Sequence, residues 1–248
     1  MDTTVAKNTY KKDYQISYAD IDHKMALKPS SLFNYLQDLA SSHAEMLGFG
    51  YSAIYPKNMV WFLLKYRMEF DEYPTGLYNL QIETEPRGYN RLFAHRDFKI
   101  INGDRVIGRI ASTWAIVDLE TRGLVSCETL NNSGMINFQK RETDLSYNKI
   151  PVIETADLSK TFEIRYDDID INGHVNNANY IIWALEPLDL ASRSSHKIKT
   201  LDMVYKKDIK YGDDVVSKIL FKDENTTIHV IRNASTSEDL CQIQIFWE

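Results

Sequence analysis

The sequence predicts an α+β fold built from two copies of one unit, in which an antiparallel sheet packs against a single helix. A short motif occurs twice, as YADID at residues 18–22 and as YDDID at residues 166–170, so the second copy follows the first by 148 residues. Each copy precedes an apolar segment with helical spacing, and strand-like segments follow in both halves. That order is typical of an antiparallel sheet with a helix on one face. Its repetition indicates a duplicated, pseudo-symmetric pair of domains.

Composition sets limits on the class of protein. The chain has 248 residues, enough for two small domains, and its 44% hydrophobic and 26% charged content is ordinary for a soluble globular protein. A net charge of −6 disfavours nucleic-acid binding, which needs a basic surplus. No apolar segment approaches the ~20 residues that span a bilayer. Residues 1–12 are predicted to be a loose tail without the apolar core of a secretory signal. With only Cys127 and Cys241, we expect a reduced, cytoplasmic chain.

Helical spacing and turn residues locate the elements of the first half. Ser30 or Ser31 is expected to cap a helix, and Gly48 and Gly50 are expected to end it. One face of this helix is apolar, through Leu32, Leu36, Leu39, Ala40, His43 and Leu47. Strands are expected at residues 14–19, 59–70, 77–86, 91–101 and 105–118.

The second half repeats this order after a stretch without periodicity. A helix is expected from about Asn177, and because its side chains are apolar nearly all the way round, it should be buried. Pro187 should end it. Strands are expected at residues 162–166, 197–210, 214–222, 226–233 and 240–247. The expected organisation is a first domain at 1–130, a surface linker at 131–160 and a second domain at 161–248.

The polar residues after the second motif are not duplicated. At the same offset, Asn172 corresponds to Lys24 and His174 to Ala26, so a purely structural requirement does not explain them. A neutral imidazole is suited to general-base catalysis, and an amide can hold an oxyanion. Asp170 can orient these groups, position water or attack directly. Together these groups suit hydrolysis of an activated acyl group. The alternative is an ordinary turn and helix cap, where Asn, Asp and Gly are common.

Residues 170–180, with the sequence DINGHVNNANY, resemble the catalytic segment of the acyl-[acyl-carrier-protein] thioesterases. Supporting segments occur in family order at residues 18–22, 96–100, 111–118 and 205–208, and the resemblance extends from about residue 10 to the end. It implies two tandem hotdog domains, each an antiparallel sheet wrapped around a central helix. The first would hold the acyl pocket and the second the catalytic residues. The implied reaction hydrolyses fatty acyl-carrier-protein thioesters to free fatty acid and carrier protein, ending fatty acid elongation.

The resemblance also implies the site residues. Asp170, Asn172 and His174 match the family's Asp, Asn and His, and Asp208 takes the family's acidic position in a later strand. Ile209 stands where plant members have a cysteine, so a cysteine nucleophile is not expected. Phe33, Leu36 and Trp61 are expected to line the acyl pocket, with core packing as the alternative for each. No metal ion and no cofactor are expected, since no ligand spacing or glycine-rich phosphate loop is present.

Several alternatives remain open from the sequence. An acyl-CoA thioesterase would hydrolyse the same thioester bond with CoA in place of the carrier protein. A non-catalytic acyl-binding pseudo-dimer would bind the acyl group without hydrolysing it. A hotdog dehydratase would act on a β-hydroxyacyl group. Lys206, Lys207 and Lys210 either dock the acidic carrier protein or form a solvated face. Acyl chain length, unsaturation preference and the choice between monomer and homodimer are not determined.

Overall fold

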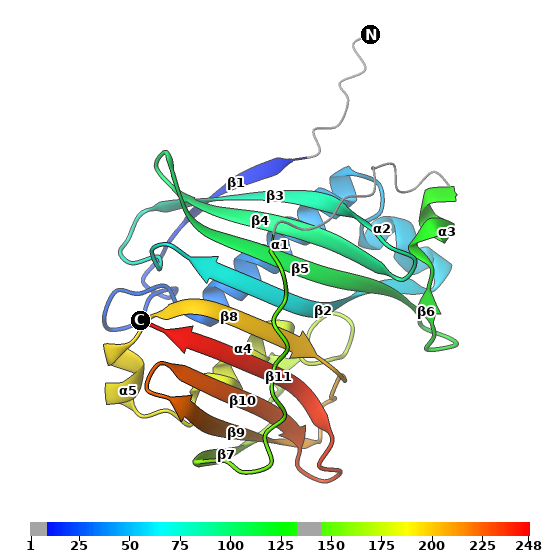
Figure 1. Cartoon of the computed structure of the whole chain (residues 1–248). Coiled ribbons are helices and arrows are strands. Elements are labelled where there is room, and N and C mark those ends of the chain that lie inside the picture. The colour runs from blue at the N-terminus through cyan, green and yellow to red at the C-terminus, as the bar shows by residue number, and fades with distance from the viewer. Residues whose placement is uncertain (1–8, 133–144) are drawn as a thin grey trace.

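One continuous sheet organises the chain. The computed structural model describes residues 9–132 and 145–248, and within these residues it has an 11-stranded sheet. The strand order is β1-β3-β4-β5-β2-β8-β11-β10-β9-β7, with β6 paired to β5 outside this path (Figure 1). All the pairings are antiparallel. The two halves therefore share one sheet through the pairing of β2 with β8.

The first half supplies one side of this sheet and its helices. Its strands are β1 (Tyr10–Gln15), β2 (Met59–Phe70), β3 (Asn79–Tyr89), β4 (Phe93–Asn102), β5 (Arg105–Asp118) and β6 (Leu124–Val125). Its helices are α1 (Pro29–Met46), α2 (Tyr51–Ile54), η1 (Tyr55–Lys57) and α3 (Cys127–Asn132).

The second half repeats the arrangement with fewer strands. These are β7 (Leu158–Glu163), β8 (Ile198–Tyr205), β9 (Asp214–Asp223), β10 (Thr226–Asn233) and β11 (Asp239–Trp247). Its helices are η2 (Tyr166–Asp168), α4 (Asn177–Leu185) and α5 (Leu190–Ser195). The predicted α+β class with two tandem hotdog domains is confirmed, because each half has an antiparallel sheet that wraps around one main helix (Figure 1). The domain boundaries stay a prediction.

The first strand of each half begins earlier in the chain than predicted. β1 begins at Tyr10 and ends at Gln15, not at residues 14–19, because its ladder with β3 starts at the Tyr10–Thr84 pair. Part of the predicted tail is therefore strand. β7 lies at residues 158–163 rather than 162–166, where it pairs with β9.

The predicted N-cap of α1 is wrong. Lys28 is the N-cap residue, it makes no side-chain capping hydrogen bond, and Pro29 occupies the first turn. Proline suits this place because it has no backbone N–H to satisfy and its fixed φ favours the helix. Ser30 and Ser31 therefore lie inside the helix. At the other end the prediction holds, since Gly48 follows the C-cap with a φ of +80°.

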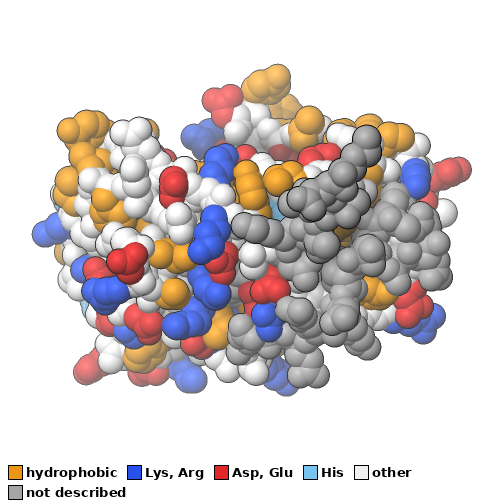
Figure 2. All heavy atoms as spheres, turned by 90° about the horizontal axis from the view of Figure 1, so that it is seen from above, with side chains coloured by type: hydrophobic (Ala, Val, Ile, Leu, Met, Phe, Trp, Pro, Cys, Tyr) orange, Lys and Arg blue, Asp and Glu red, His pale blue; other side chains and the backbone are white. Residues whose placement is uncertain are grey.

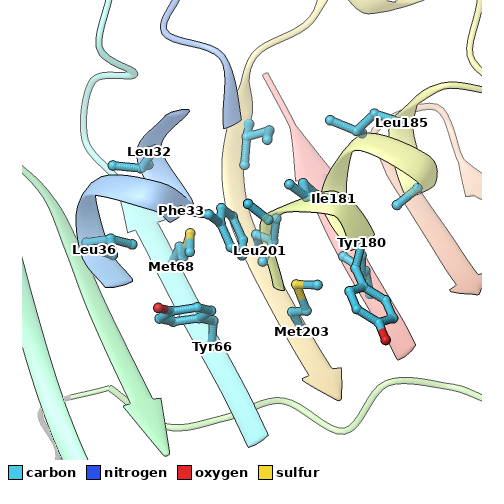
Figure 3. Close-up of a cluster of buried hydrophobic side chains, with 14 of the residues drawn as sticks. Leu32, Phe33, Leu36, Tyr66, Met68, Tyr180, Ile181, Leu185, Leu201 and Met203 are labelled. Atoms are coloured by element: carbon cyan, nitrogen blue, oxygen red, sulfur yellow. The ribbon is translucent and has the colours of Figure 1, made fainter. Parts of the chain in front are cut away.

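The core is continuous between the two halves. Helices α1 and α4 contact each other on the concave side of the sheet, and Figure 3 shows their side chains meeting above β2 and β8. Phe33 and Leu36 of α1 are buried in the same cluster as Ile181 of α4 and Met203 of β8. The predicted burial of α4 is observed except at Ile182, which is 38% exposed. Such a shared core resembles the interior of one domain rather than a transient interface.

An ion pair reinforces the junction within the sheet. Arg67 of β2 lies opposite Asp202 of β8, and its Nη1 is 2.5 Å from Asp202 Oδ2, with both side chains buried. The segment before β7, which crosses the strands in Figure 1, adds Asn148, whose backbone N and Nδ2 donate to the same carboxylate at 3.2 and 3.1 Å. Removing one member of such a buried pair costs roughly 3–5 kcal/mol. Within the described residues, no helix is long and apolar enough to cross a membrane.

A buried histidine ties α4 to the second half of the sheet. His229 of β10 is fully buried, with Nδ1 2.8 Å from the carbonyl oxygen of Ala184 and Nε2 2.8 Å from Thr227 Oγ1. Thr227 Oγ1 also accepts from Trp247 Nε1 at 2.8 Å. The tautomer with hydrogen on Nδ1 satisfies both contacts of the neutral ring. Burial lowers the pKa of His229 from its ordinary 6.5 to about 4.

We expect this depressed pKa to destabilise the protein in mild acid. Below pH 6.5 the unfolded chain binds a proton at His229, whereas the folded chain does not bind it until the pH falls to about 4. The free energy of unfolding should therefore fall with decreasing pH, by about 3 kcal/mol in total across this window. Urea unfolding of the wild type and of His229→Gln from pH 7 to pH 4.5 tests this. The free energy of unfolding of His229→Gln should change less with pH than that of the wild type. The control is His196→Gln, at an exposed histidine, and it should keep the pH dependence of the wild type. Equal slopes for the wild type and His229→Gln would contradict the assignment.

Candidate active site

The turn before α4 is closed by one carboxylate. Asp170 Oδ1 accepts hydrogen bonds from the backbone N–H groups of Asn172 at 2.8 Å and His174 at 3.2 Å. The backbone N–H of Asp170 in turn donates to the carbonyl of His174 at 2.7 Å. Gly173 has a φ of +76°, a conformation that glycine adopts without steric penalty. The turn therefore holds Asn172 and His174 in a fixed relation to Asp170.

The first half contains the same turn. Asp22 Oδ1 accepts from the backbone N–H groups of Lys24 and Ala26, both at 2.9 Å, and the Asp22 N–H donates to the Ala26 carbonyl at 2.9 Å. Met25 has a φ of +64° where the second half has glycine. Asp170 thus has a structural duty that its counterpart shares. The second turn differs in carrying an amide and an imidazole at Asn172 and His174, where the first has Lys24 and Ala26.

A second set of hydrogen bonds fixes this turn to α4. Asn176 is the N-cap residue, and its Oδ1 accepts from Ala178 N at 2.9 Å. The carbonyl of buried Asp168 accepts from Asn176 N at 2.8 Å and from Asn179 Nδ2 at 3.0 Å. The Asp168 carboxylate is held by Arg165, with Nη2 2.7 Å from Oδ1. These hydrogen bonds hold the turn that carries Asn172 and His174 against the start of α4.

His174 meets a carboxylate from another part of the chain. Its Nε2 lies 3.3 Å from Asp208 Oδ2, and the side chains are 14% and 42% exposed. The prediction that Asp208 lies in a strand is wrong, because β8 ends at Tyr205 and Asp208 follows in a loop. The next residue anchors that loop, since the carbonyl of buried Ile209 accepts from Val175 N at 3.3 Å. The early end of β8 is what lets Asp208 approach the imidazole.

The site also contains a residue from the first half. The ring of Phe62 on β2 lies 5.9 Å from the ring of His174, centroid to centroid. Phe62 precedes the stretch of β2 that pairs with β8, which begins at Lys65, so the site lies where the two strands part. No local sequence signal points to Phe62, because its role depends on pairing between halves.

The four predicted site residues lie close together. Asn172 is exposed, and its Nδ2 is 3.5 Å from Asp170 Oδ2, the oxygen that does not close the turn. Tyr180 is buried below them, and burial, with the nearby Cys241, Asp208 and Asp170, raises the pKa of its hydroxyl. It is therefore neutral. Across residues 9–132 and 145–248, no group of three or more His, Cys, Asp or Glu side chains is placed to hold a metal ion.

A cavity lies between α1 and the first half of the sheet. Its walls are Ala40, Ser41, Ala44, Phe49, Trp61, Pro86, Ala94, His95, Arg96 and Trp114. The inner face of α1 explains its position, because large residues such as Leu36 fill the space near the helix start whereas Ala40 and Ala44 leave space near its end. The indole N–H groups are satisfied elsewhere, Trp61 by the Phe49 carbonyl at 2.9 Å and Trp114 by Ser112 Oγ at 2.8 Å. The cavity therefore offers mostly apolar surface.

The residues expected in an acyl pocket occupy two different environments. Trp61 is one of the cavity walls. Phe33 and Leu36 belong to the central core (Figure 3), and Phe33 packs edge-on against Tyr66 with ring centroids 5.2 Å apart. Neither is among the lining residues of the cavity. A substrate-binding role stays a prediction for all three.

The three lysines near Asp208 differ in the ion pairs that they form. Lys206 Nζ is 3.3 Å from Asp239 Oδ2, and Lys207 forms an ion pair with Glu238. Lys210 is exposed. Because these residues follow the end of β8, strand alternation does not assign them to faces. On the face shown in Figure 2, acidic and basic side chains intermingle, with a column of Lys and Arg near the middle.

Comparison with known protein families gives two adjacent matches. Residues 7–129 match the family described as acyl-ACP thioesterase N-terminal domain, and residues 153–248 match the acyl-ACP thioesterase C-terminal domain. Together the two matches cover most of the chain, and they lie on either side of the segment that separates the two halves.

Individual proteins show the same similarity. A chloroplastic palmitoyl-acyl carrier protein thioesterase of Gossypium hirsutum is 25% identical over 231 residues, covering 88% of this chain and 56% of that protein. A chloroplastic oleoyl-acyl carrier protein thioesterase of Coriandrum sativum is 25% identical over 240 residues, covering 89% and 65%. The chain thus spans little more than half the length of these relatives. The crystal structure of an acyl-ACP thioesterase from Bacteroides thetaiotaomicron aligns with a TM-score of 0.84 and 25% identity, covering 97% and 98% of the two chains.

The shared turn geometry predicts similar structural losses in both halves. Asp22→Ala and Asp170→Ala each remove an acceptor of two backbone N–H groups, so each should lower the free energy of unfolding by about 1–3 kcal/mol. Asp22→Asn and Asp170→Asn keep an acceptor oxygen and should lose less. Urea unfolding of the four variants measures this. A loss at Asp22 without one at Asp170 would contradict the common role.

Proposed function

Because the chain belongs to the acyl-ACP thioesterase family, we propose that it hydrolyses fatty acyl thioesters of acyl carrier protein to free fatty acid and carrier protein. The observation that carries the proposal is the His174–Asp208 contact beside Asn172, built on only one of two otherwise equivalent turns. A duplicated fold that keeps a base, a carboxylate and an amide in one copy supports catalysis at that copy.

The proposed mechanism assigns one tautomer to His174. In this proposal the hydrogen is on Nε2, the nitrogen that lies 3.3 Å from Asp208 Oδ2, and the carboxylate orients the ring. The lone pair is then on Nδ1, which takes a proton from water as that water attacks the thioester carbon. Asn172 Nδ2 stabilises the negative charge that develops on the carbonyl oxygen. The carbon–sulfur bond then breaks, and the protonated His174 returns its proton to the thiolate.

Asp170 acts as a positioning residue in this proposal. Its Oδ1 already accepts two backbone hydrogen bonds, and Oδ2 faces the Asn172 amide. A carboxylate engaged in this way is poorly suited to attack. The same arrangement at Asp22, where Lys24 and Ala26 replace the amide and the imidazole, supports a structural duty.

The environment of the cysteines supports a mechanism without a thiol nucleophile. Cys127 and Cys241 are both buried, and burial raises the pKa of Cys127 to about 11 and that of Cys241 well above its ordinary value. Thiols of this kind are inert because the thiolate is the reactive form. Ile209, where plant members have a cysteine, is buried beside Asp208.

The cavity beneath α1 is proposed to hold the acyl chain. Its apolar walls suit a hydrocarbon, and Trp61 belongs both to the cavity and to β2, the strand that carries Phe62. In this proposal the acyl group lies in the first half while the thioester lies at the turn of the second half. The junction of β2 and β8 then joins the two functions.

Removing either polar group from the second turn should reduce catalysis strongly. We expect His174→Ala and Asn172→Ala each to lower kcat/KM for acyl-carrier-protein by about 100-fold or more, because a general base and an oxyanion donor are lost. Released thiol measures the rate. Lys24→Ala, at the equivalent position of the first turn, is the matched control and should keep full activity.

Full activity of both His174→Ala and Asn172→Ala would contradict the assignment. In the same reactions, quenched with acid and mapped by mass spectrometry, no acyl group should be found on Asp170. An acyl-enzyme at that carboxylate would instead establish a nucleophile. Tight acyl binding without thiol release would indicate an acyl-binding protein, and dehydration with an intact thioester would indicate a dehydratase.

Recognition of the carrier protein can be tested at Lys210, an exposed lysine that follows Asp208 by two residues. If it contacts the acidic carrier, Lys210→Glu should lower kcat/KM for acyl-carrier-protein several-fold and change acyl-CoA turnover little, with a steeper loss at low salt. Lys222→Glu, at an exposed lysine of β9, is the control. Equal effects on the two substrates would argue against docking at Lys210, and faster turnover of acyl-CoA by the wild type would favour CoA as the handle.

A further inference from the structure

The cavity beneath α1 has one charged wall. Arg96 of β4 lines it and is only 6% exposed. Its Nη1 is 3.1 Å from both Thr84 Oγ1 and His43 Nδ1, and neither partner is an anion. Burial lowers the pKa of Arg96 to about 10, which still leaves the guanidinium charged at neutral pH. A buried cation therefore faces a cavity whose other walls are mostly apolar.

The guanidinium has donors to spare. It has five N–H groups, yet the hydrogen bonds that it makes within the described residues all involve Nη1. The nearest acidic residue in sequence, Asp97, is paired instead with Arg87, whose Nε lies 3.5 Å from Asp97 Oδ2. Nε and Nη2 are not among the fully buried polar atoms of the described residues that lack a partner, so these donors reach the space of the cavity and can donate to a ligand there.

An unsatisfied hydroxyl lies in the same row of the sheet. Tyr66 of β2 pairs with Ser112 of β5, which pairs with Arg96 of β4. The Tyr66 hydroxyl is fully buried and has no hydrogen-bond partner among the described residues. Figure 3 shows it directed beneath α1, away from α4. Burial raises the pKa of Tyr66, so this hydroxyl is a neutral donor and acceptor.

A purely hydrocarbon ligand would fit this wall poorly. It would displace water from the free N–H groups of Arg96 without replacing the lost hydrogen bonds, and desolvating a charge in this way is unfavourable. Ligand cavities that are mainly apolar commonly use a few polar groups to select one ligand over another. Here the polar lining residues are Arg96, Ser41 and His95, and Arg96 is the cationic donor among them.

We propose that the preferred acyl group carries an oxygen, as a hydroxyl or an oxo group, that accepts a hydrogen bond from Arg96 inside the cavity. This inference rests on the proposed function and specifies its substrate class. The Arg96 donors select such a chain because they would lose their acceptor with an unsubstituted one. A cavity that hydrogen-bonds a substrate group discriminates more strongly than a purely apolar one.

The test is a series of acyl-carrier-protein substrates of one chain length. One member is unsubstituted, and the others carry a single hydroxyl or oxo group moved stepwise from carbon 3 to the chain end. For the wild type, at least one oxygenated position should have a kcat/KM at least 10-fold above that of the unsubstituted chain. In Arg96→Met, similar in length but without donors, this advantage should fall below 2-fold. An unsubstituted chain that is preferred over every oxygenated one would overturn the inference.

Arg96 also joins α1 to the sheet through His43, so a folding defect must be separated from a loss of selectivity. Arg96→Lys keeps a charged donor and should retain part of the preference, with Tm recorded for both variants. A purely structural role would lower Tm and leave the ranking of substrates unchanged, which would contradict the proposal. If Arg96→Met does not fold, the wild-type series alone decides. Failure to hydrolyse any acyl-carrier-protein would contradict the proposed function instead.

Discussion

The antiparallel pairing of β2 with β8 is the interaction on which the remaining structure depends. It turns two duplicated sheets into one, and Arg67 and Asp202 pair across it while buried. Since α1 and α4 pack together against these same strands, the largest hydrophobic core extends through both halves. The active-site geometry is a consequence of where this ladder stops. Beyond Lys65 and Val204 the strands part, and the loop with Asp208 and the ring of Phe62 approach His174 from different halves.

Duplication also explains how structural and catalytic duties are divided. Asp22 and Asp170 close equivalent turns with the same backbone hydrogen bonds, so the frame was available in both copies. Chemistry at such a frame requires only the side chains that project from it. In the second copy these are an amide and an imidazole, and in the first a lysine and an alanine. The first copy instead has the cavity, because Ala40 and Ala44 leave space between α1 and the sheet.

The two functional regions make opposite use of burial. At the catalytic turn the groups are partly exposed, and the His174 imidazole contacts a carboxylate that remains 42% exposed. In the cavity, Arg96 is almost completely removed from solvent, and its hydrogen-bond partners within the described residues are the Thr84 hydroxyl and the His43 imidazole. In the proposed mechanism, the partial exposure of the catalytic turn lets water and the thioester reach the His174 imidazole. The proposed selection of oxygenated chains depends on the burial of Arg96, because hydrogen bonds to a charged group are stronger where solvent is excluded.

The sequence alone determined the repeat, the class of fold and the turn that holds Asp170, Asn172 and His174, because these depend on local spacing and on a motif written twice. It also located β2, β5 and β10 at their observed bounds, since alternation and turn residues act over short distances. Only the tertiary structure decided that β8 ends at Tyr205, that Phe62 contacts His174 and that Arg96 faces a cavity. The physical reason is that pairing between distant strands and the volume left by small residues on α1 arise from packing between halves, which local sequence patterns do not encode.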